Sequence, residues 1–255
     1  MQEATCSVPC SPVRAEPSHR SEMVNQLIFG EDCHILELLK EEWVHIESNL
    51  DGYKGYCQLS HITDVENREN AWRIMLTTDW VTSIECYGTT MKVPLGSRIK
   101  VLENSELNRG SNSAGIPVSL WDPEVADKDF NQLENLSLQF LNTAYLWGGK
   151  TVFGTDCSGF TQTIFQFFNI KLQRDAWQQA EQGFSVNTLE DAQPCDLAFF
   201  ESDGGKITHV GIIMSNSAII HASGRVRIDR LDQEGIINKE SGKRTHVLNR
   251  IKRFF

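Results

Sequence analysis

Two neighbouring stretches decide the fold of the C-terminal half of this chain: Tyr145-Leu146-Trp147-Gly148-Gly149 and Thr155-Asp156-Cys157-Ser158-Gly159. They form a glycine-rich loop and the start of a helix, because Phe160, Ile164 and Phe167 follow at helical spacing. Cys157 is therefore predicted at a helix N-terminus, where backbone N–H groups favour a thiolate and can hold an oxyanion. The sequence offers Cys157 as a nucleophile, although a lone cysteine on an apolar helix is also typical of a buried small side chain.

Two histidines flank a predicted hairpin turn further along the chain. Residues 207–214 and 218–223 read as strands around Ser215-Asn216-Ser217. If the turn centres on Ser215, His209 lies opposite His221, with Cβ atoms roughly 5 Å apart. One imidazole can then act as the base toward Cys157 while the other orients its ring. Two structural strand histidines are the alternative.

The surrounding pattern predicts an α+β domain over residues 127–255. Leu133, Leu136 and Phe140 predict a helix before the glycine-rich loop, with Asp127 or Asp129 as its cap. A sheet follows the second helix. Its expected strands are residues 196–200, 207–214, 218–223, 226–228 and 246–254.

The N-terminal half reads as short strands. Residues 1–66 contain strand patterns at a spacing of about ten residues, which suggests a small barrel. Residues 67–126 repeat this style more loosely and are interpreted as a second, diverged barrel. The expected strands are residues 24–29, 33–39, 43–47 and 55–59 in the first module, and residues 79–86, 91–94, 98–102 and 116–121 in the second.

Composition excludes several classes of protein. The 255 residues carry a formal charge of −10 and a pI near 5.2, which argues against nucleic-acid binding. No stretch approaches the ~18 apolar residues that span a bilayer, and the N-terminus lacks the pattern of a signal peptide. The seven cysteines form no CxxC pair and no Cys/His cluster with zinc-ligand spacing, so we expect no structural metal, and thiol chemistry at Cys157 would need no cofactor.

The motifs together resemble the NlpC/P60 cysteine peptidase family. They are the two stretches quoted above, His209-Val210-Gly211-Ile212 and His221-Ala222-Ser223, in order over about residues 130–255. The resemblance implies a papain-like fold and hydrolysis of γ-D-glutamyl–diamino acid bonds in peptidoglycan stem peptides. It also implies Cys157 as the nucleophile, His209 as the base, His221 as the polar third member and Tyr145 as a contributor to the oxyanion site. Trp147, Asp156 and Ser158 match positions that line the substrate cleft.

The N-terminal modules are similar to bacterial SH3 (SH3b) domains, whose last strand carries a pair such as Gly55-Tyr56. Members with such modules resemble dipeptidyl-peptidase VI-type enzymes, which act on released fragments with a free N-terminal L-Ala. The resemblance suggests Glu22 and Tyr56, with Asp156, as the residues that recognise this amine. A surface carboxylate and a barrel aromatic are the alternative for Glu22 and Tyr56. The expected partner is the stem peptide, with no obligate protein partner.

The sequence departs from the family pattern at two places. Gln173 stands at the proline of the family's Leu-Pro-Arg motif, Ala176 stands where the family often has a small hydroxyl residue, and Cys195 replaces a turn glycine. A papain-like amidase, a cross-bridge endopeptidase, an acyltransferase and a wall-binding protein remain alternatives. The expected compartment is the cell envelope or periplasm, with the cytoplasm as the alternative.

Overall fold

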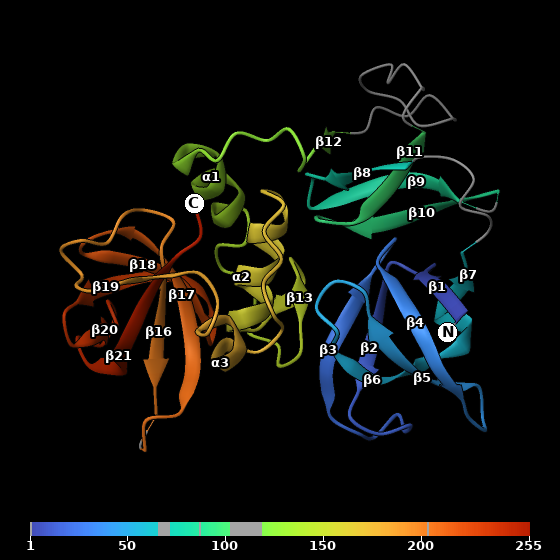
Figure 1. Ribbon diagram of the computed structural model, residues 1–255, viewed down its shortest axis with the longest axis horizontal. Coiled ribbons are helices and arrows are strands. Elements are labelled where there is room, and N and C mark those ends of the chain that lie inside the picture. Colours follow the sequence, from blue (N-terminus) through green and yellow to red (C-terminus); the bar gives the residue numbers. More distant parts are fainter. Residues whose placement is uncertain (1, 66–71, 87, 103–118, 203) are drawn as a thin grey trace. The chain divides into compact units, whose positions relative to one another are not determined.

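The computed structural model describes residues 2–65, 72–86, 88–102, 119–202 and 204–255 (Figure 1). The chain divides into two compact units, Met1–Ala126 and Asp127–Phe255. The first unit consists almost wholly of strands, whereas the second combines helices with a sheet. The fold class predicted from the sequence is confirmed.

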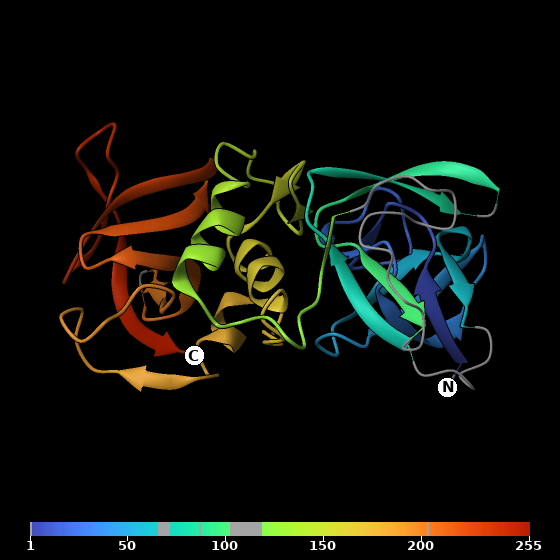
Figure 2. The same cartoon turned by 90° about the horizontal axis from the view of Figure 1, so that it is seen from above.

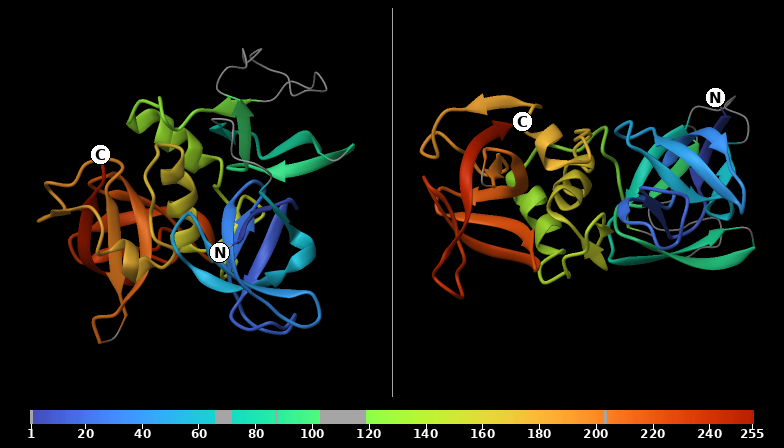
Figure 3. Two further views of the ribbon diagram at one scale, coloured as in Figure 1. Left: turned by 45° about the vertical axis from the view of Figure 1, so that its right-hand side comes forward. Right: turned by 90° about the horizontal axis from the view of Figure 1, so that it is seen from below.

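A seven-stranded antiparallel sheet opens the first unit, in the order β3-β2-β6-β5-β4-β1-β7. Its strands curve around a core that includes Leu27, Val44 and Ile46 (Figure 3). Alternate residues are buried along β1 and β2, as the period of two requires, whereas β3 buries four consecutive residues. The elements are β1 (Gln2–Cys6), β2 (Cys10–Arg14), β3 (Met23–Ile28), β4 (Asp32–Leu38), β5 (Trp43–Ser48), β6 (Lys54–Gln58), the short 3-10 helix η1 (Leu59–His61) and β7 (Ile62–Asp64).

A second group of strands follows in the same unit and forms two smaller sheets. The pair β10-β9 is one, and β11-β8-β12 is the other. The bounds are β8 (Trp72–Thr77), β9 (Val81–Cys86), β10 (Thr89–Pro94), β11 (Arg98–Leu102) and β12 (Leu120–Trp121). The predicted boundary between residues 66 and 67 lies outside the described residues, as do residues 116–118 of the predicted closing strand. The reading of this group as a diverged barrel stays an interpretation.

The described residues of the second unit form three helices, a two-stranded sheet of β13 and β14, and a seven-stranded sheet that closes on itself. The sheet order is β15-β21-β16-β17-β18-β19-β20, and β20 also pairs with β21. The helices lie together on one side of these strands (Figures 1 and 2). The helices are α1 (Phe130–Leu138), α2 (Cys157–Gln166) and α3 (Ala176–Gln179); the strands are β13 (Lys150–Thr151), β14 (Gly154–Thr155), β15 (Phe184–Val186), β16 (Leu197–Glu201), β17 (Ile207–Ser215), β18 (Ala218–Ser223), β19 (Arg225–Asp232), β20 (Gly235–Ile237) and β21 (Arg244–Arg253).

Helix α2 packs against β17 and β18, and every one of its residues is buried. Phe160 and Ile164 supply its apolar face, as their spacing predicts. This packing places the N-terminus of α2 beside β17, the strand that contains His209. Within the described part of the chain, no helix is long and apolar enough to cross a membrane.

Two local predictions about this unit are confirmed. Asp129 caps α1, because its side chain accepts a hydrogen bond from the Asn131 backbone N–H. Cys195 has a φ of 78°, a left-handed conformation that favours glycine, and its side chain is buried. Cys195 therefore occupies a turn-glycine position with a structural role.

Candidate active site

Cys157 is the first residue of α2, and its side chain is only 6% exposed. Its Sγ atom lies 4.0 Å from the Thr208 carbonyl oxygen, beside His209 on β17. Burial, and after it the charge of Asp156, raise the pKa of the Cys157 thiol to about 12, even though the backbone N–H groups of Val210 and Ser158 act to lower it. Burial therefore opposes the thiolate that the backbone donors at the helix N-terminus favour.

His209 and His221 meet through their ring nitrogens. The distance from His209 Nε2 to His221 Nδ1 is 2.8 Å, and both rings are buried. The predicted register is wrong, since His221 lies opposite Gly211 rather than His209. The turn lies at Asn216 and Ser217 rather than on Ser215, and an irregularity between Ile213 and Ser215 shifts the pairing by one residue. Together they place the observed pairing two residues from the predicted one. A shift of two keeps every side chain on its face, so the histidines still come together.

Gly211 makes this diagonal contact between the histidines possible. A Cβ atom at this position would lie 2.9 Å from the His221 Cβ and 2.8 Å from the Ile219 Cδ1. Both distances are shorter than side chains tolerate, so only glycine leaves room for the His221 ring above β17. The glycine of the His-Val-Gly-Ile stretch is thus part of the site.

His209 is held neutral by its surroundings. Burial lowers its pKa well below the ordinary value, and the neighbouring His221 and His246 lower it further. His246, from β21, stacks on His209 with ring centroids 4.1 Å apart. Burial likewise lowers the pKa of His246 to about 4. A neutral imidazole beside a neutral thiol can accept the thiol proton during attack.

The three histidines also raise the question of a metal. One nitrogen each from His209, His221 and His246 lies within 4.8 Å of the others. A metal ion binds in the plane of each imidazole, however, and His246 lies nearly parallel over His209, at an interplanar angle of 24°. The facing nitrogens of His209 and His221 are hydrogen-bonded to each other. The present arrangement fits a proton-transfer pair better than a metal site.

Asp156 and Ser158 form a buried polar cluster with Arg174 under the N-terminus of α2. Arg174 donates to both carboxylate oxygens of Asp156, at 3.0 and 2.6 Å, and to Ser158 Oγ at 2.9 Å. The same carboxylate accepts from the backbone N–H groups of Gly148 and Gly159. Asp156 thereby ties the glycine-rich loop, the helix and Arg174 together. Its predicted substrate contact stays a prediction.

Gly159 allows the loop to approach α2 so closely. A Cβ atom on Gly159 would lie 2.1 Å from the Gly149 carbonyl oxygen. Gly149 has a similar packing reason, since a Cβ atom there would lie 2.4 Å from the Gly154 carbonyl oxygen.

Tyr145 and Trp147 come from the loop that precedes α2. The Tyr145 backbone N–H donates to Gly224 O at 3.0 Å, and the residue pairs with Thr155. Burial and the nearby Cys157 raise the pKa of the Tyr145 phenol, which keeps its O–H as a donor. Trp147 is 60% exposed. Their predicted roles as an oxyanion donor and a cleft residue stay predictions.

Glu22 and Tyr56 belong to the first unit. Glu22 is exposed next to β3, and its carbonyl oxygen accepts from Ala15 N at 3.0 Å. Tyr56 lies on β6 opposite Arg14 of β2 and stacks on His45, with centroids 4.7 Å apart. Their part in substrate recognition stays a prediction.

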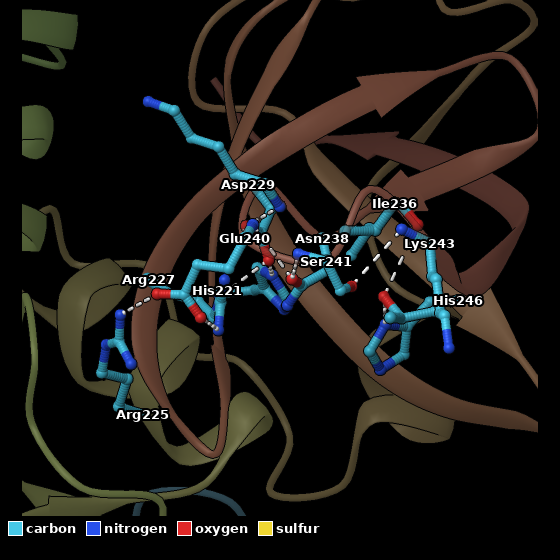
Figure 4. A network of polar contacts seen from close by, with 12 residues as sticks. His221, Arg225, Arg227, Asp229, Ile236, Asn238, Glu240, Ser241, Lys243 and His246 are labelled. Carbon is cyan, nitrogen blue, oxygen red and sulfur yellow. Dashed lines mark hydrogen bonds and ion pairs between the residues drawn. The ribbon is translucent and has the colours of Figure 1, made fainter.

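Sequence reasoning missed three residues that surround the site: Arg174, His246 and Asp229. The Arg174 signal was present in the Leu172-Gln173-Arg174 stretch, which matches the family's Leu-Pro-Arg motif. The sequence offers no comparable local signal for His246 or Asp229, since both reach the histidine pair through sheet pairing. Figure 4 shows Asp229 next to His221, and their Oδ2 and Nε2 atoms are 3.2 Å apart.

Comparisons with known families assign both units. Residues 142–245 match the NlpC/P60 family, and residues 13–62 match the bacterial dipeptidyl-peptidase Sh3 domain. A crystal structure of an NlpC/P60 family protein from Bacillus cereus ATCC 10987 superposes with a TM-score of 0.81 over 98% of this chain and 99% of that one, at 20% identity. An NlpC/P60 endopeptidase from Photobacterium damselae covers 97% of this chain and 70% of its own, with a TM-score of 0.68 at 18% identity. These two structures show the fold.

Two curated relatives extend over nearly the whole chain. A dipeptidyl-peptidase 6 from Lysinibacillus sphaericus is 25% identical over 86% of this chain and 88% of its own. A gamma-D-glutamyl-L-lysine dipeptidyl-peptidase from Bacillus cereus is 36% identical over 90% of this chain and 77% of its own. This identity over most of both chains, together with the two family matches, shows that the protein belongs to the NlpC/P60 family of cysteine peptidases and carries a bacterial dipeptidyl-peptidase SH3 domain.

Proposed function

We propose that this peptidase hydrolyses the γ-D-glutamyl–diamino acid bond of peptidoglycan stem peptides. The observation that carries the proposal is the placement of Cys157 at the start of α2, against the strand whose His209 is hydrogen-bonded to His221. The name of the Bacillus cereus relative supports the same bond. The chemistry is acyl transfer through a thioester.

Acylation begins with a neutral thiol and a neutral imidazole. As Sγ attacks the γ-carbonyl carbon of D-glutamate, His209 takes the thiol proton, and the carbonyl oxygen becomes an oxyanion. Two donors bind that oxyanion: the Cys157 backbone N–H and the Tyr145 O–H. The Cys157 N–H is in the first turn of the helix, where backbone N–H groups have no partner within the helix. His209 then gives its proton to the amine of the diamino acid as the C–N bond breaks, leaving the thioester.

Deacylation uses the same groups in reverse roles. A water molecule gives a proton to His209 and attacks the thioester carbonyl. The second oxyanion collapses, the C–S bond breaks, and the proton returns to Cys157. Because burial keeps the pKa of the thiol high and that of His209 low, the proton moves only in step with bond making and breaking.

The proposed substrate is a released fragment with a free N-terminal L-Ala. Glu22, Tyr56 and Asp156 are proposed to recognise its ammonium group. Arg174 neutralises much of the charge on Asp156, so Glu22 supplies the uncompensated carboxylate in this proposal. The SH3-domain match in the first unit supports this comparison with dipeptidyl-peptidases.

The cell envelope stays a prediction for the compartment, with the cytoplasm as the alternative. The thiols of Cys6, Cys33, Cys57, Cys86, Cys157 and Cys195 are free. Free thiols are typical of reducing compartments, so this observation favours the alternative. Burial raises the pKa of Cys33 and Cys57 to about 12, which makes both thiols poor nucleophiles.

The test is product identification with defined tripeptides. The purified protein is incubated with L-Ala-γ-D-Glu-L-Lys or L-Ala-γ-D-Glu-meso-diaminopimelate, and products are identified by mass spectrometry. We expect L-Ala-D-Glu and the free diamino acid, and no cleavage of the α-linked isomer. Intact tripeptide, with cleavage of amide or cross-bridge substrates instead, would replace this proposal with one of the papain-like alternatives.

A second comparison tests the amine. We expect N-acetylation of L-Ala to lower kcat/KM strongly, mainly by removing the ion pair with Glu22. Equal rates on free and N-acetylated substrate would discard the role of Glu22, Tyr56 and Asp156 in recognition and would point to intact wall as the substrate.

A further inference from the structure

Asp229 lies behind His221, on the side away from His209. Its Oδ2 atom is 3.2 Å from His221 Nε2, while His221 Nδ1 is 2.8 Å from His209 Nε2. The two nitrogens of one imidazole thus face a carboxylate on one side and the catalytic base on the other. The side chains of His221 and Asp229 are each 1% exposed, so bulk water does not compete for these contacts.

Three groups, His221, Lys239 and Arg227, hold Asp229 in its charged form against the effect of burial. Arg227 donates to it through Nε at 2.8 Å and Nη2 at 3.1 Å, and the Lys239 backbone N–H donates at 2.9 Å (Figure 4). Burial alone would raise the pKa of Asp229, but the hydrogen bonds from His221, Lys239 and Arg227 hold it well below its usual range. An ionised carboxylate can only accept hydrogen bonds.

This leaves one arrangement of protons for a neutral His221. Its Nε2 carries the proton and donates to Asp229, so its Nδ1 keeps a lone pair and accepts. The facing Nε2 of His209 must then be the donor. In a neutral His209 the remaining nitrogen, Nδ1, is unprotonated and is the one available to the Cys157 thiol.

We infer that Asp229 is a positioning residue that sets the tautomers of His221 and His209 through this chain of hydrogen bonds. The opposite tautomers would put a proton on His209 Nδ1 and leave Cys157 without a base. This inference rests on the proposed hydrolysis and adds a fourth side chain to Cys157, His209 and His221. The base then needs no proton rearrangement before attack.

The residues around these hydrogen bonds support the proposed direction of donation from His209 to His221 to Asp229. Glu240 binds Arg227 at 3.3 Å and Arg225 at 2.6 Å, which fixes the guanidinium that holds Asp229. His246 is the other titratable ring against the pair, and it stacks on His209 without a hydrogen bond between them in the described contacts. The charge that faces the histidines therefore comes from Asp229, backed by Arg227.

The tautomers can be read directly in the unmutated full-length protein. Long-range proton–nitrogen correlation spectra of protein with ¹⁵N-labelled histidines distinguish protonated from unprotonated ring nitrogens, and His209→Gln and His221→Gln variants assign the signals. We expect protonated Nε2 and unprotonated Nδ1 on both rings. A proton on Nδ1 of either ring would overturn the inference. No substrate is needed, so this result is independent of whether the proposed hydrolysis holds.

Asp229→Asn supplies the functional readout. An asparagine amide has one oxygen where aspartate has two. Its NH₂ group therefore faces either the donors of Arg227 and Lys239 or the Nε2 atom of His221. Facing Nε2, the NH₂ group donates to it and favours the tautomer with the proton on Nδ1 of His221. We expect kcat/KM on the tripeptide to fall about 10- to 100-fold, with the His209 proton moved to Nδ1. Asp229→Glu, which keeps the carboxylate, should recover part of the loss.

Asp232→Asn is the matched control. Asp232 lies on the same strand and binds Arg244 through two hydrogen bonds, and no imidazole is among its described contacts. We expect unchanged rates and unchanged histidine spectra. Wild-type tautomers in Asp229→Asn, with or without a lower rate, would reduce Asp229 to a structural residue. If Asp229→Asn fails to fold, the spectrum of the unmutated protein decides.

Discussion

Two buried aspartates support this site, one on each side of the chemistry, and each is bound by an arginine. Asp156 lies under the nucleophile and pairs with Arg174, while Asp229 lies behind the base and pairs with Arg227. Asp156 gives its remaining hydrogen-bonding capacity to backbone N–H groups of Gly148 and Gly159. Asp229 gives part of its capacity to the ring of His221.

The two aspartate–arginine pairs are chemically alike, but they have different roles in the site. Removing Asp156 unties a loop and a helix, so the consequence is first structural. Removing Asp229 changes which nitrogen of an imidazole carries a proton, so the consequence is first chemical. The Arg174 side chain is 1% exposed and that of Arg227 is 12% exposed, which makes the Asp156 pair the costlier one to break.

The largest expected effect is therefore on stability, from Asp156→Ala. The variant leaves the buried Arg174 without its partner and removes the cap of α2, and we expect a loss of about 3–5 kcal/mol in the free energy of unfolding. Urea denaturation measures it. Asp232→Ala, which breaks an exposed pair with Arg244, is the control and should change stability far less. Similar losses in both variants would contradict the structural role of Asp156.

Gly211→Ala tests the base side through packing. The new Cβ meets His221 and Ile219, and relief of this contact displaces the imidazole. We expect a cost of about 1–3 kcal/mol in stability together with a fall in kcat. Thr208→Ala, an exposed position on the same strand, should be close to neutral in both assays. A fully active Gly211→Ala protein would show that the histidine pair does not need its present register.

The buried histidines His209 and His246 should also dominate the pH dependence of stability. The folded-state pKa of His246 is lowered to about 4, and that of His209 lies well below 6.5, so the unfolded chain binds more protons than the folded one below pH 6.5. Stability is therefore full above pH 6.5 and falls as the pH drops toward 4, by up to about 1.4 kcal/mol per pH unit for each ring.

Urea denaturation at pH 7, 6 and 5 measures this slope. His246→Phe keeps the stacking surface but cannot take up a proton, so its slope should be shallower by the contribution of one ring. A wild-type protein with constant stability over this range would mean that the histidines are not held neutral by burial.

The smallest expected effect concerns the exposed rim. Trp147 touches neither aspartate cluster in the described contacts and is largely exposed, so Trp147→Ala should raise KM less than tenfold and leave kcat unchanged. Steady-state kinetics on the tripeptide measure both constants. A large fall in kcat would place Trp147 at the reacting atoms rather than along the cleft.

The sequence predicts those parts of the site that depend on local spacing. The stripe of Phe160 and Ile164 and the glycines around them place Cys157 at the start of α2. The histidines come together although the predicted register is wrong, because the error of two residues keeps the face of a strand. Because strand side chains alternate faces with a period of two, this register error did not change the predicted contact between the histidines.

The remaining residues depend on long-range pairing and could not be predicted. Asp229 reaches His221 only because β19 pairs with β18, and His246 reaches His209 only because β21 returns beside β16. In the first unit, β1 and β2 were missed because these five-residue segments, QEATC and CSPVR, carry only one β-branched residue each and no aromatic residue. Sheet pairing supplies the partners of such segments, and a local pattern does not report it.

The most direct test of the central claim is to trap the thioester on Cys157. The protein is mixed with excess L-Ala-γ-D-Glu-L-Lys, quenched rapidly in acid and analysed by mass spectrometry of the intact chain and its peptides. We predict an added mass equal to the L-Ala-γ-D-glutamyl acyl group on the peptide that contains Cys157, and neither adduct nor turnover in Cys157→Ala. Turnover that persists in Cys157→Ala, or an adduct on another residue, would contradict the account.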